Sequence, residues 1–269
     1  MSKLEVLVAT MKQDDFSIVE RMNITSSAVI ANQHNRNDIE TKEIAGNQIK
    51  MITTSTRGVG LNRNIALLAS SAEYLLFADD DMIYYDGSLD GVVKAFDDMP
   101  QADVIIFSFE HSKDGKIYEK VHLPIKKLHW WNSMRYGTYA VAIRREAVIK
   151  NNITFNQLFG GGCIYSCGED SLFIMDCFKS GLKVYSHSCV LGECKKDTSS
   201  WFYGYDKKYF HDKGVLFSFL FPKAKSLIIP IFAIKMKIKL KTEFSALQIF
   251  KLMRKGVKSG RKCLPYTEK

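Results

Sequence analysis

An apolar stretch that runs directly into three aspartates places the tightest limit on how this chain can fold. Leu75 to Ala78 are apolar, and Asp79, Asp80 and Asp81 follow without a break. A short apolar run of this kind predicts a strand that is buried on both faces of a parallel sheet. Carboxylates crowded at the carboxyl end of such a strand repel one another unless a cation lies among them. The first expectation is therefore a sheet with an acidic, cation-binding edge.

The spacing of the aspartates indicates which cation would suit them. If the strand stays extended, Asp79 and Asp81 point the same way and Asp80 turns aside, because side chains alternate along a strand. Two carboxylates, with phosphate oxygens completing the set, suit Mg²⁺ or Mn²⁺. A solvated acidic turn closed by Asp86-Gly87 is the alternative interpretation.

Strands and helices alternate along most of the chain. The apolar patterns predict helices at 16–22, 61–69, after Ser88, at 145–150 and at 168–179. They predict strands at 4–9, 28–31, 50–53, 75–78, 104–109, 116–121, 139–143 and 183–186, with 50–53 at an edge and Asp114-Gly115 as a hairpin turn. This alternation predicts an α/β fold with a doubly wound sheet, whose ligands bind beyond the carboxyl ends of the strands.

A second informative stretch begins at a triple-glycine loop, Gly160 to Gly162, and continues to Glu169 and Asp170 at the start of a helix. Acidic residues in the first turn of a helix are stabilised by its dipole, so capping alone could explain this pair. Because the pair follows a glycine loop in a chain that already has an aspartate cluster, we interpret it as the source of a catalytic base.

These landmarks together resemble the GT-A glycosyltransferases, specifically the inverting family 2 type of bacterial polysaccharide assembly. The resemblance spans roughly residues 4 to 190 and rests on the four motifs Ala9-Thr10, Gly60 to Asn64, Asp79-x-Asp81 and Gly168 to Asp170. It implies a Rossmann-like, mostly parallel sheet. It also implies transfer of a sugar from a nucleoside diphosphate, uridine by family habit, to a glycan hydroxyl with Mn²⁺ or Mg²⁺.

The resemblance also implies roles for individual residues. The residues implied in nucleotide-sugar binding are Thr10, Met11, Asn32, Arg57, Arg63, Asp79, Asp80 and Asp81. Asp81, with Asp79, would hold the metal, and Arg63 would face the diphosphate. Asp170 would be the base for the acceptor hydroxyl, with Glu169 on the acceptor side. One departure is that Asn32-Gln33 stands where many members carry an acidic pair, which leaves the identity of the nucleobase open.

Four further side chains are candidates with a plain alternative. His187 follows a predicted strand, where some GT-A enzymes place a metal-binding histidine, but a histidine bonded to backbone fits equally. Trp130, Trp131 and Trp201 could stack on acceptor sugars, or they could pack in the core.

The charge of the chain is concentrated at its C-terminal end. Residues 207–269 contain sixteen Lys or Arg and three acidic residues, for a net charge of +13, so the first 206 residues carry −4 of the total +9. We therefore predict a GT-A domain over 1–212 and a basic, largely helical segment over 213–269. Lysines alternate with aliphatic residues across 216–262 without a run long enough to span a bilayer, which favours an anionic membrane surface as the partner. An oligomer interface, or a helical subdomain packed on the body, is the alternative.

The remaining expectations concern place and rival functions. No secretory signal is evident near the N-terminus, so the six cysteines are expected to be reduced thiols. The enzyme is expected to be cytoplasmic and peripheral on the inner face of the membrane. Its acceptor is expected to be a lipid-linked glycan. The rival enzyme is a sugar nucleotidyltransferase, which would want a glycine-rich phosphate loop after the first strand. The non-enzymatic rival is a nucleic-acid-binding protein, which the aliphatic residues between the lysines disfavour.

Overall fold

The computed structural model describes residues 2–133, 136–195, 204–240 and 242–263. Its strands are β1 (Leu4–Met11), β2 (Ser27–Gln33), β3 (Asp38–Ile44), β4 (Asn47–Thr54), β5 (Tyr74–Asp79), β6 (Met82–Tyr84), β7 (Val104–Lys113), β8 (Lys116–Val121), β9 (Lys126–Lys127), β10 (Val141–Arg144) and β11 (Val184–Lys195). Its helices are α1 (Ser17–Arg21), α2 (Val59–Ala69), α3 (Ser88–Asp98), α4 (Trp130–Ser133), the short 3₁₀ helix η1 (Thr138–Ala140), α5 (Arg145–Lys150), α6 (Glu169–Lys179), α7 (Lys207–Leu220), α8 (Lys225–Lys239) and α9 (Ala246–Cys263).

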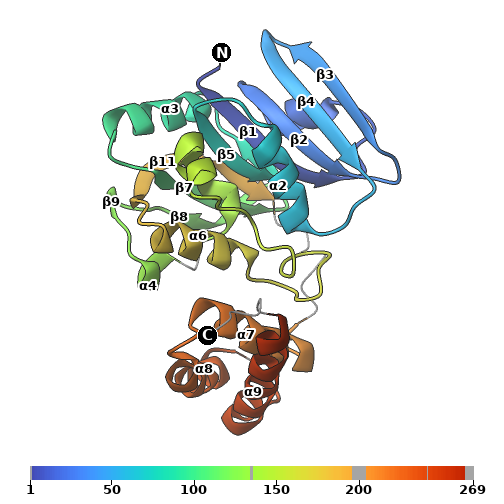
Figure 1. Cartoon of the computed structure of the whole chain (residues 1–269). Helices are drawn as coiled ribbons and strands as arrows, with labels where there is room; N and C mark the ends of the chain where they lie inside the picture. The colour runs from blue at the N-terminus through green and yellow to red at the C-terminus, as the bar shows by residue number, and fades with distance from the viewer. Residues whose placement is uncertain (1, 134–135, 196–203, 241, 264–269) are drawn as a thin grey trace.

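The strands form one mixed sheet in the order β3-β4-β2-β1-β5-β10-β7-β11-β6, with β8 paired to β7 and β9 paired to β11 (Figure 1). Strands β4, β2, β1, β5, β7 and β11 run in the same direction, while β10 is inserted antiparallel between β5 and β7. The carboxyl ends of the parallel strands therefore meet along one edge, which is where the predicted donor-binding residues lie.

Helices cover both faces of the sheet, as the alternation of elements predicts. One face packs against α1 and α3 through buried residues such as Ile18 and Phe96. The other face packs against α2, α5 and α6 through residues such as Leu67, Val148 and Phe173. The predicted α/β, mostly parallel doubly wound architecture is thus confirmed.

The edge of the sheet differs from the prediction. The strand expected at the edge, 50–53, is part of β4 and lies between β2 and β3, so β3 is the edge strand. The sequence of β3, DIETKEI, is mostly exposed on both faces and therefore lacks the alternation of a half-buried strand. Its hairpin turn uses Ala45 and Gly46 at positive φ, and alanine gives no turn signal.

Two further elements depart from their predicted bounds. The strand expected at 139–143 begins only at Val141, because η1 occupies Thr138–Ala140. The strand expected to end at residue 186 continues to Lys195 as β11, so His187 lies inside a strand and not after one. Bulges between His187 and Glu193 interrupt the alternation that would have marked the longer strand.

The C-terminal helices form a third hydrophobic cluster. Helices α7, α8 and α9 bury Phe210, Val215 and Ile249, and this cluster continues into the α/β body through Phe159 and Leu172. Figure 1 shows the three helices together at one end of the molecule. The boundary predicted between residues 212 and 213 falls inside α7. Pro222 lies between α7 and α8, whereas α8 continues through Pro230.

Glycines let α7 and α9 approach closely. A Cβ on Gly214 would lie 2.1 Å from the carbonyl oxygen of Met253, and one on Gly256 would lie 2.0 Å from that of His211. Both positions therefore require glycine where α7 and α9 cross. Among the helices that the structure describes, none has both the length and the apolar composition that crossing a bilayer requires.

Candidate active site

A buried arginine joins three acidic side chains from two distant parts of the sequence. Arg63 lies on α2 with 4% of its surface exposed. Its Nη2 donates to Asp79 Oδ1 at 2.8 Å, and its Nη1 donates to Asp170 Oδ1 at 2.8 Å and to Glu169 Oε1 at 3.2 Å. Burial alone would lower the pKa of Arg63, but the charges of the three carboxylates outweigh it and raise the pKa. The guanidinium therefore organises the acidic cluster as a permanent cation.

The residues on either side of Arg63 fix its helix to the sheet. Asn62 donates to the carbonyl oxygens of Thr10 and Ala31, at the ends of β1 and β2. Asn64 exchanges two hydrogen bonds with the main chain of Phe155. The three polar residues at the start of α2 thus have separate partners, which explains why an otherwise amphipathic helix buries all three.

The three aspartates do not continue one extended strand. β5 ends at Asp79, and Asp80 and Asp81 form a turn that leads into β6. Asp80 accepts a hydrogen bond from the Thr10 hydroxyl at 2.6 Å. Burial by the surrounding protein and the charge of Asp79 raise the pKa of Asp81 to about 6, although its side chain reaches solvent. Asp79 and Asp80 therefore place negative charge beside Asp81, which adds to the effect of burial.

Asp170 is held by one of its two carboxylate oxygens. Oδ1 accepts from Arg63 and from the Thr138 hydroxyl. Among the described residues, Oδ2 accepts no hydrogen bond, and 27% of the side chain is exposed. An oriented carboxylate with one free oxygen at the protein surface has the arrangement that a general base needs.

Glu169, predicted on the acceptor side, is the more buried member of the pair. Its side chain is 11% exposed, and it accepts from Arg63 and from the backbone N–H of Gly168. Burial and the neighbouring charge of Asp170 raise the pKa of Glu169 to about 7, against the opposing effect of Arg63. Contact with an acceptor remains a prediction for this residue.

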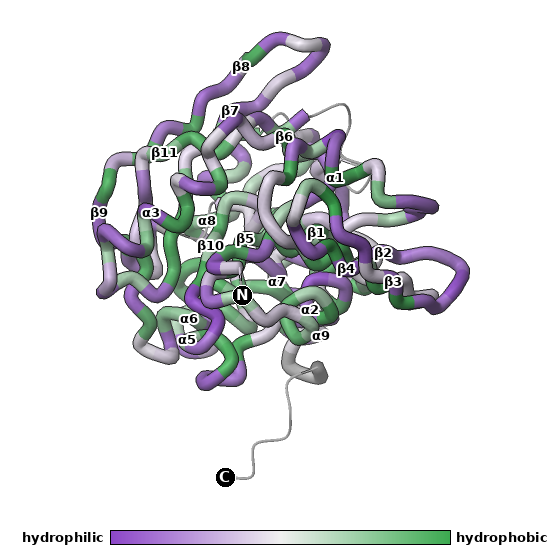
Figure 2. The backbone as a smooth tube through the Cα atoms, turned by 90° about the horizontal axis from the view of Figure 1, so that it is seen from above, coloured by the Kyte–Doolittle hydropathy of each residue, from purple (hydrophilic) through white to green (hydrophobic). Residues whose placement is uncertain are grey.

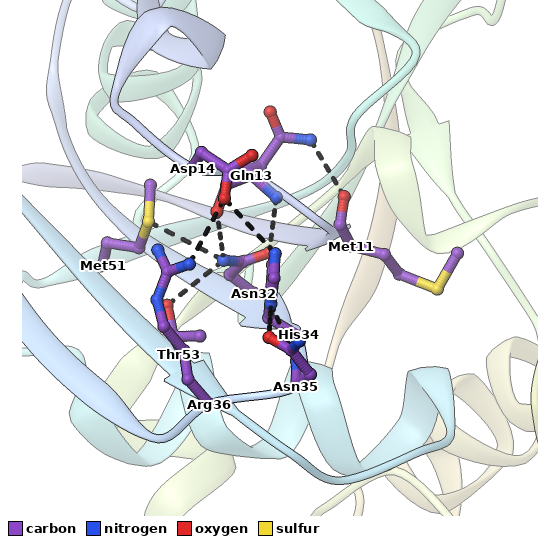
Figure 3. Close-up of polar contacts among 9 residues, drawn as sticks. All are labelled: Met11, Gln13, Asp14, Asn32, His34, Asn35, Arg36, Met51 and Thr53. Atoms are coloured by element: carbon purple, nitrogen blue, oxygen red, sulfur yellow. Dashed lines mark hydrogen bonds and ion pairs between the residues drawn. The ribbon is translucent and has the colours of Figure 1, made fainter.

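The loop after β1 is tied to β2 through Asn32, which is fully buried (Figure 3). Its side-chain oxygen accepts from the backbone N–H of Gln13, and its Nδ2 donates to Gln13 O and to the Thr53 hydroxyl. Gln13 in turn donates to Thr10 Oγ1 at 2.9 Å and to Met11 O at 3.1 Å. Asn32 therefore holds the shape of the loop that carries Thr10 and Met11, and its predicted contact with a nucleobase remains untested.

An exposed acidic side chain lies next to this loop. Asp14 is 80% exposed and faces two basic groups, Arg36 Nη1 at 3.2 Å and His34 Nε2 at 3.4 Å (Figure 3). Arg57, also predicted to bind the donor, is exposed in the segment that precedes α2. Asp14, His34 and Arg36 were not predicted, since their partners are set by the pairing of β1 with β2.

Three residues beside the acidic cluster also escaped prediction. Thr138 and Tyr139 lie on η1, and burial together with the charges of Cys194, Asp79, Asp81 and Asp170 raises the pKa of Tyr139. Tyr84 is fully buried, and its hydroxyl has no hydrogen-bond partner among the described residues. Tyr139 was interpreted as the first residue of a strand and Thr138 was assigned to no element, so neither was expected beside the acidic cluster.

The remaining predicted residues lie away from the arginine cluster. The His187 ring lies 5.6 Å from that of Phe107, and its Nδ1 accepts from the Cys189 N–H. Further along β11, the backbone N–H of Lys195 donates to the carbonyl oxygen of Asp81, and the side chain of Cys194 bonds to the Asp81 carboxylate. Trp130 and Trp131 are 43% and 63% exposed on α4, so they are not core residues. Trp201 lies outside the described residues.

Metal ligation is not preformed in the described part of the chain. There, no group of three or more His, Cys, Asp or Glu side chains is arranged to hold a metal ion. The five described cysteines are all free, as expected for reduced thiols.

Comparison with known protein families found a match for part of this chain. A family model described as glycosyl transferase family 2 matches residues 26–159, a range that includes Arg63 and the three aspartates but ends before Glu169. A search of curated proteins found no match.

Solved structures of S. aureus TarS share the fold. The structure of TarS residues 1–349 in complex with UDP-GlcNAc has a TM-score of 0.59 and 15% identity, covering 98% of this chain and 93% of that one. The complex of the same protein with UDP has a TM-score of 0.60 and 14% identity, with the same coverage. A third structure of TarS has a TM-score of 0.55 and 14% identity, covering 95% of this chain and 43% of that one. With its sheet order, its acidic edge and its family match, this chain is a family 2-like glycosyltransferase of the GT-A fold.

Proposed function

We propose that this protein transfers a sugar from a uridine-diphosphate donor to a hydroxyl group of a glycan, with inversion at the anomeric carbon. The observation that carries the proposal is the Arg63 cluster, in which one guanidinium orients Asp79 at the end of β5 and Asp170 at the start of α6. Support for uridine comes from TarS, whose solved complexes contain UDP and UDP-GlcNAc.

Asp170 would act as the base. Its free Oδ2 takes the proton from the acceptor hydroxyl, and the acceptor oxygen forms a bond to the anomeric carbon. The bond between that carbon and the diphosphate oxygen breaks, and its electron pair leaves with the nucleoside diphosphate. Because attack and departure occur on opposite faces of the sugar, the base and the diphosphate site must come from separate segments, as α6 and β5 do.

A divalent cation fits the aspartate turn. Asp81 and Asp79 offer only carboxylate oxygens, which Mg²⁺ and Mn²⁺ prefer, and burial together with the neighbouring charge of Asp79 raises the pKa of Asp81, a penalty that a bound cation would relieve. Asp81 would be the direct ligand, with Asp79 beside it. A bound cation would act as a Lewis acid that stabilises the departing diphosphate.

The donor would lie along the carboxyl edge of the sheet. Thr10 and the loop that Asn32 fixes would flank the nucleoside, and Asp80 is held against this loop by Thr10. The exposed ring of Trp131 on α4 would stack on acceptor sugars. The acceptor would be a lipid-linked glycan of cell-surface polysaccharide assembly, reached from the cytoplasmic face of the membrane.

The experiment is a panel of nucleotide-sugars incubated with the protein, glycan acceptors and Mn²⁺, with released nucleoside diphosphate as the readout. Asp170→Asn keeps the shape of the base and removes its proton affinity, so transfer should fall by about 10²–10⁴-fold while donor binding barely changes. Asp81→Asn should abolish turnover and metal-dependent binding of UDP.

Controls distinguish the rival functions. Glu146→Gln changes an acidic residue at the start of α5, away from the cluster, and should leave transfer unchanged. Release of pyrophosphate in place of UDP would assign the protein to the sugar nucleotidyltransferases. Full activity in EDTA would refute the role of a metal ion. If Glu169→Gln lost activity while Asp170→Asn kept it, Glu169 and not Asp170 would be the base.

A further inference from the structure

Helix α8 carries a row of large aliphatic side chains on its outer face. Leu227, Ile231, Ile234 and Ile238 are 71%, 61%, 55% and 79% exposed. They recur at i, i+4, i+7 and i+11, a spacing that places all four on one side of a helix. At 1.5 Å per residue the row is about 16 Å long. We call these four residues the α8 stripe.

The opposite side of α8 is already packed, so the α8 stripe is not part of the protein core. Ile229 and Ala233 are buried against α7 and α9, and the Phe232 ring lies 4.8 Å from that of Phe217. At 100° per residue these inward positions lie roughly opposite the stripe. The helix is therefore fixed in place with its second apolar side facing outward, and single exposed aliphatic residues do not explain such a row.

Cations border the α8 stripe, and acidic residues are missing from its helix and from α9. Lys235 and Lys237 are exposed and lie about 80° to either side of the centre of the stripe. The sequences of α8 and α9 contain no Asp or Glu. Lys251, Arg254, Lys255 and Lys258 add an exposed basic row on the outer side of α9.

We propose that the α8 stripe docks on an anionic lipid bilayer, with α8 lying in the plane of the membrane surface. The four aliphatic side chains would enter the boundary between headgroups and acyl chains. Lys235 and Lys237 are long enough to extend from the border of the stripe to lipid phosphates, which is the usual position of lysine at such a surface. The docking surface goes beyond the proposed transfer reaction and does not depend on it.

Two other partners fit the surface less well. A symmetric contact between two copies through this face would bring the lysines of one α8 against those of the other, with no acidic residue in either α8 or α9 to neutralise them. A nucleic acid would leave the aliphatic row in contact with water or phosphate, because such binding uses cations with exposed aromatic rings. A bilayer satisfies the aliphatic and the cationic groups together.

The test is sedimentation of the full chain with vesicles of phosphatidylcholine alone or of phosphatidylcholine with phosphatidylglycerol, at low and high salt. Binding should require the anionic lipid and should fall as salt rises. The triple variant Ile231→Ser, Ile234→Ser, Ile238→Ser should lower the partition coefficient by about tenfold or more. Its matched control changes three exposed isoleucines elsewhere, Ile39, Ile117 and Ile125, to serine and should bind like the wild type.

A charge variant tests the lysines separately. Lys235→Glu with Lys237→Glu should also weaken binding by about tenfold or more, whereas Lys126→Glu with Lys127→Glu changes the same charge on exposed β9 and should not. All substituted side chains are exposed, so the variants should keep the thermal unfolding midpoint of the wild type. Equal losses for the α8 and control variants, or a wild type that stays in the supernatant, would overturn the proposal. So would an α8 triple variant that dissociates an oligomer in sedimentation velocity while vesicle binding is unchanged.

Discussion

Glu169 makes the stability of this protein depend on pH in a direction opposite to that of an ordinary paired carboxylate. Its pKa is raised from 4.5 to about 7, chiefly because burial penalises the charged form. Between these two values the folded state binds more protons than the unfolded state. The free energy of unfolding therefore falls as the pH rises through this window.

The magnitude follows from the two pKa values. One pKa unit corresponds to about 1.4 kcal/mol, and most of the shift is expressed between pH 5 and pH 8, so Glu169 should cost about 2 kcal/mol of stability over that range. Glu169→Gln removes the titration and keeps an oxygen that can accept from Arg63 or from the Gly168 N–H. The variant should therefore gain about 2 kcal/mol relative to the wild type as the pH rises.

The assay is urea unfolding of both proteins at a series of pH values, in buffer without divalent cations. Titration of the carboxylates that do not interact with Glu169 cancels in the difference between the two proteins, so the difference reports on Glu169 together with its neighbour Asp170. Glu43→Gln, on the exposed edge strand β3, controls for the loss of one acidic residue from the chain. A difference between Glu169→Gln and wild type that does not change with pH would refute the reasoning. A wild type that gains on the variant with rising pH would show that Arg63 holds Glu169 in its charged form.

Three further substitutions test the packing and the polar contacts that hold the site. Arg63→Lys should lower the free energy of unfolding by about 3 kcal/mol, since one ammonium cannot span the carboxylates that the guanidinium joins, and an unchanged urea midpoint would contradict this. Asn32→Ala breaks the hydrogen bonds to Gln13 and should cost about 1–3 kcal/mol while weakening UDP binding; calorimetric titration with UDP checks the second effect. Gly256→Ala drives a Cβ to 2.0 Å from His211 O and should cost about 1–3 kcal/mol, seen as a lower Tm, whereas a Tm equal to that of the wild type would mean that α7 and α9 separate freely.

The apolar runs of this chain determined most of its architecture. The strands at 4–9, 75–78 and 104–109 are recognisable because they are buried on both faces. Burial on both faces requires a continuous apolar run, which is visible in the sequence. The hairpin at Asp114-Gly115 and helix α5 follow equally from local signals. The edge strand β3 was not predicted, because it buries neither face and its sequence therefore contains no apolar run.

The chemistry of the site depended on both the sequence and the tertiary structure. Carboxylates in two short motifs, with an arginine that precedes both of them in the sequence, indicated an acidic active site from residue types alone. Only the tertiary structure brought Arg63 to Asp170, 107 residues further along the chain, and placed Thr138 beside the same carboxylate. Such contacts are set by which strands are neighbours in the sheet, and a periodic pattern in the sequence carries no information about that order.

The C-terminal region shows most clearly what the sequence indicated and what only the tertiary structure decided. The sequence alone showed the excess of lysines among aliphatic residues, which indicated an anionic surface as the partner of this region. The sequence could not decide which apolar residues of α8 face inward, because Ile229 and Ile231 are chemically alike. Ile229 is 3% exposed and Ile231 is 61% exposed, and that difference arises only because α7 and α9 pack against one side of the helix.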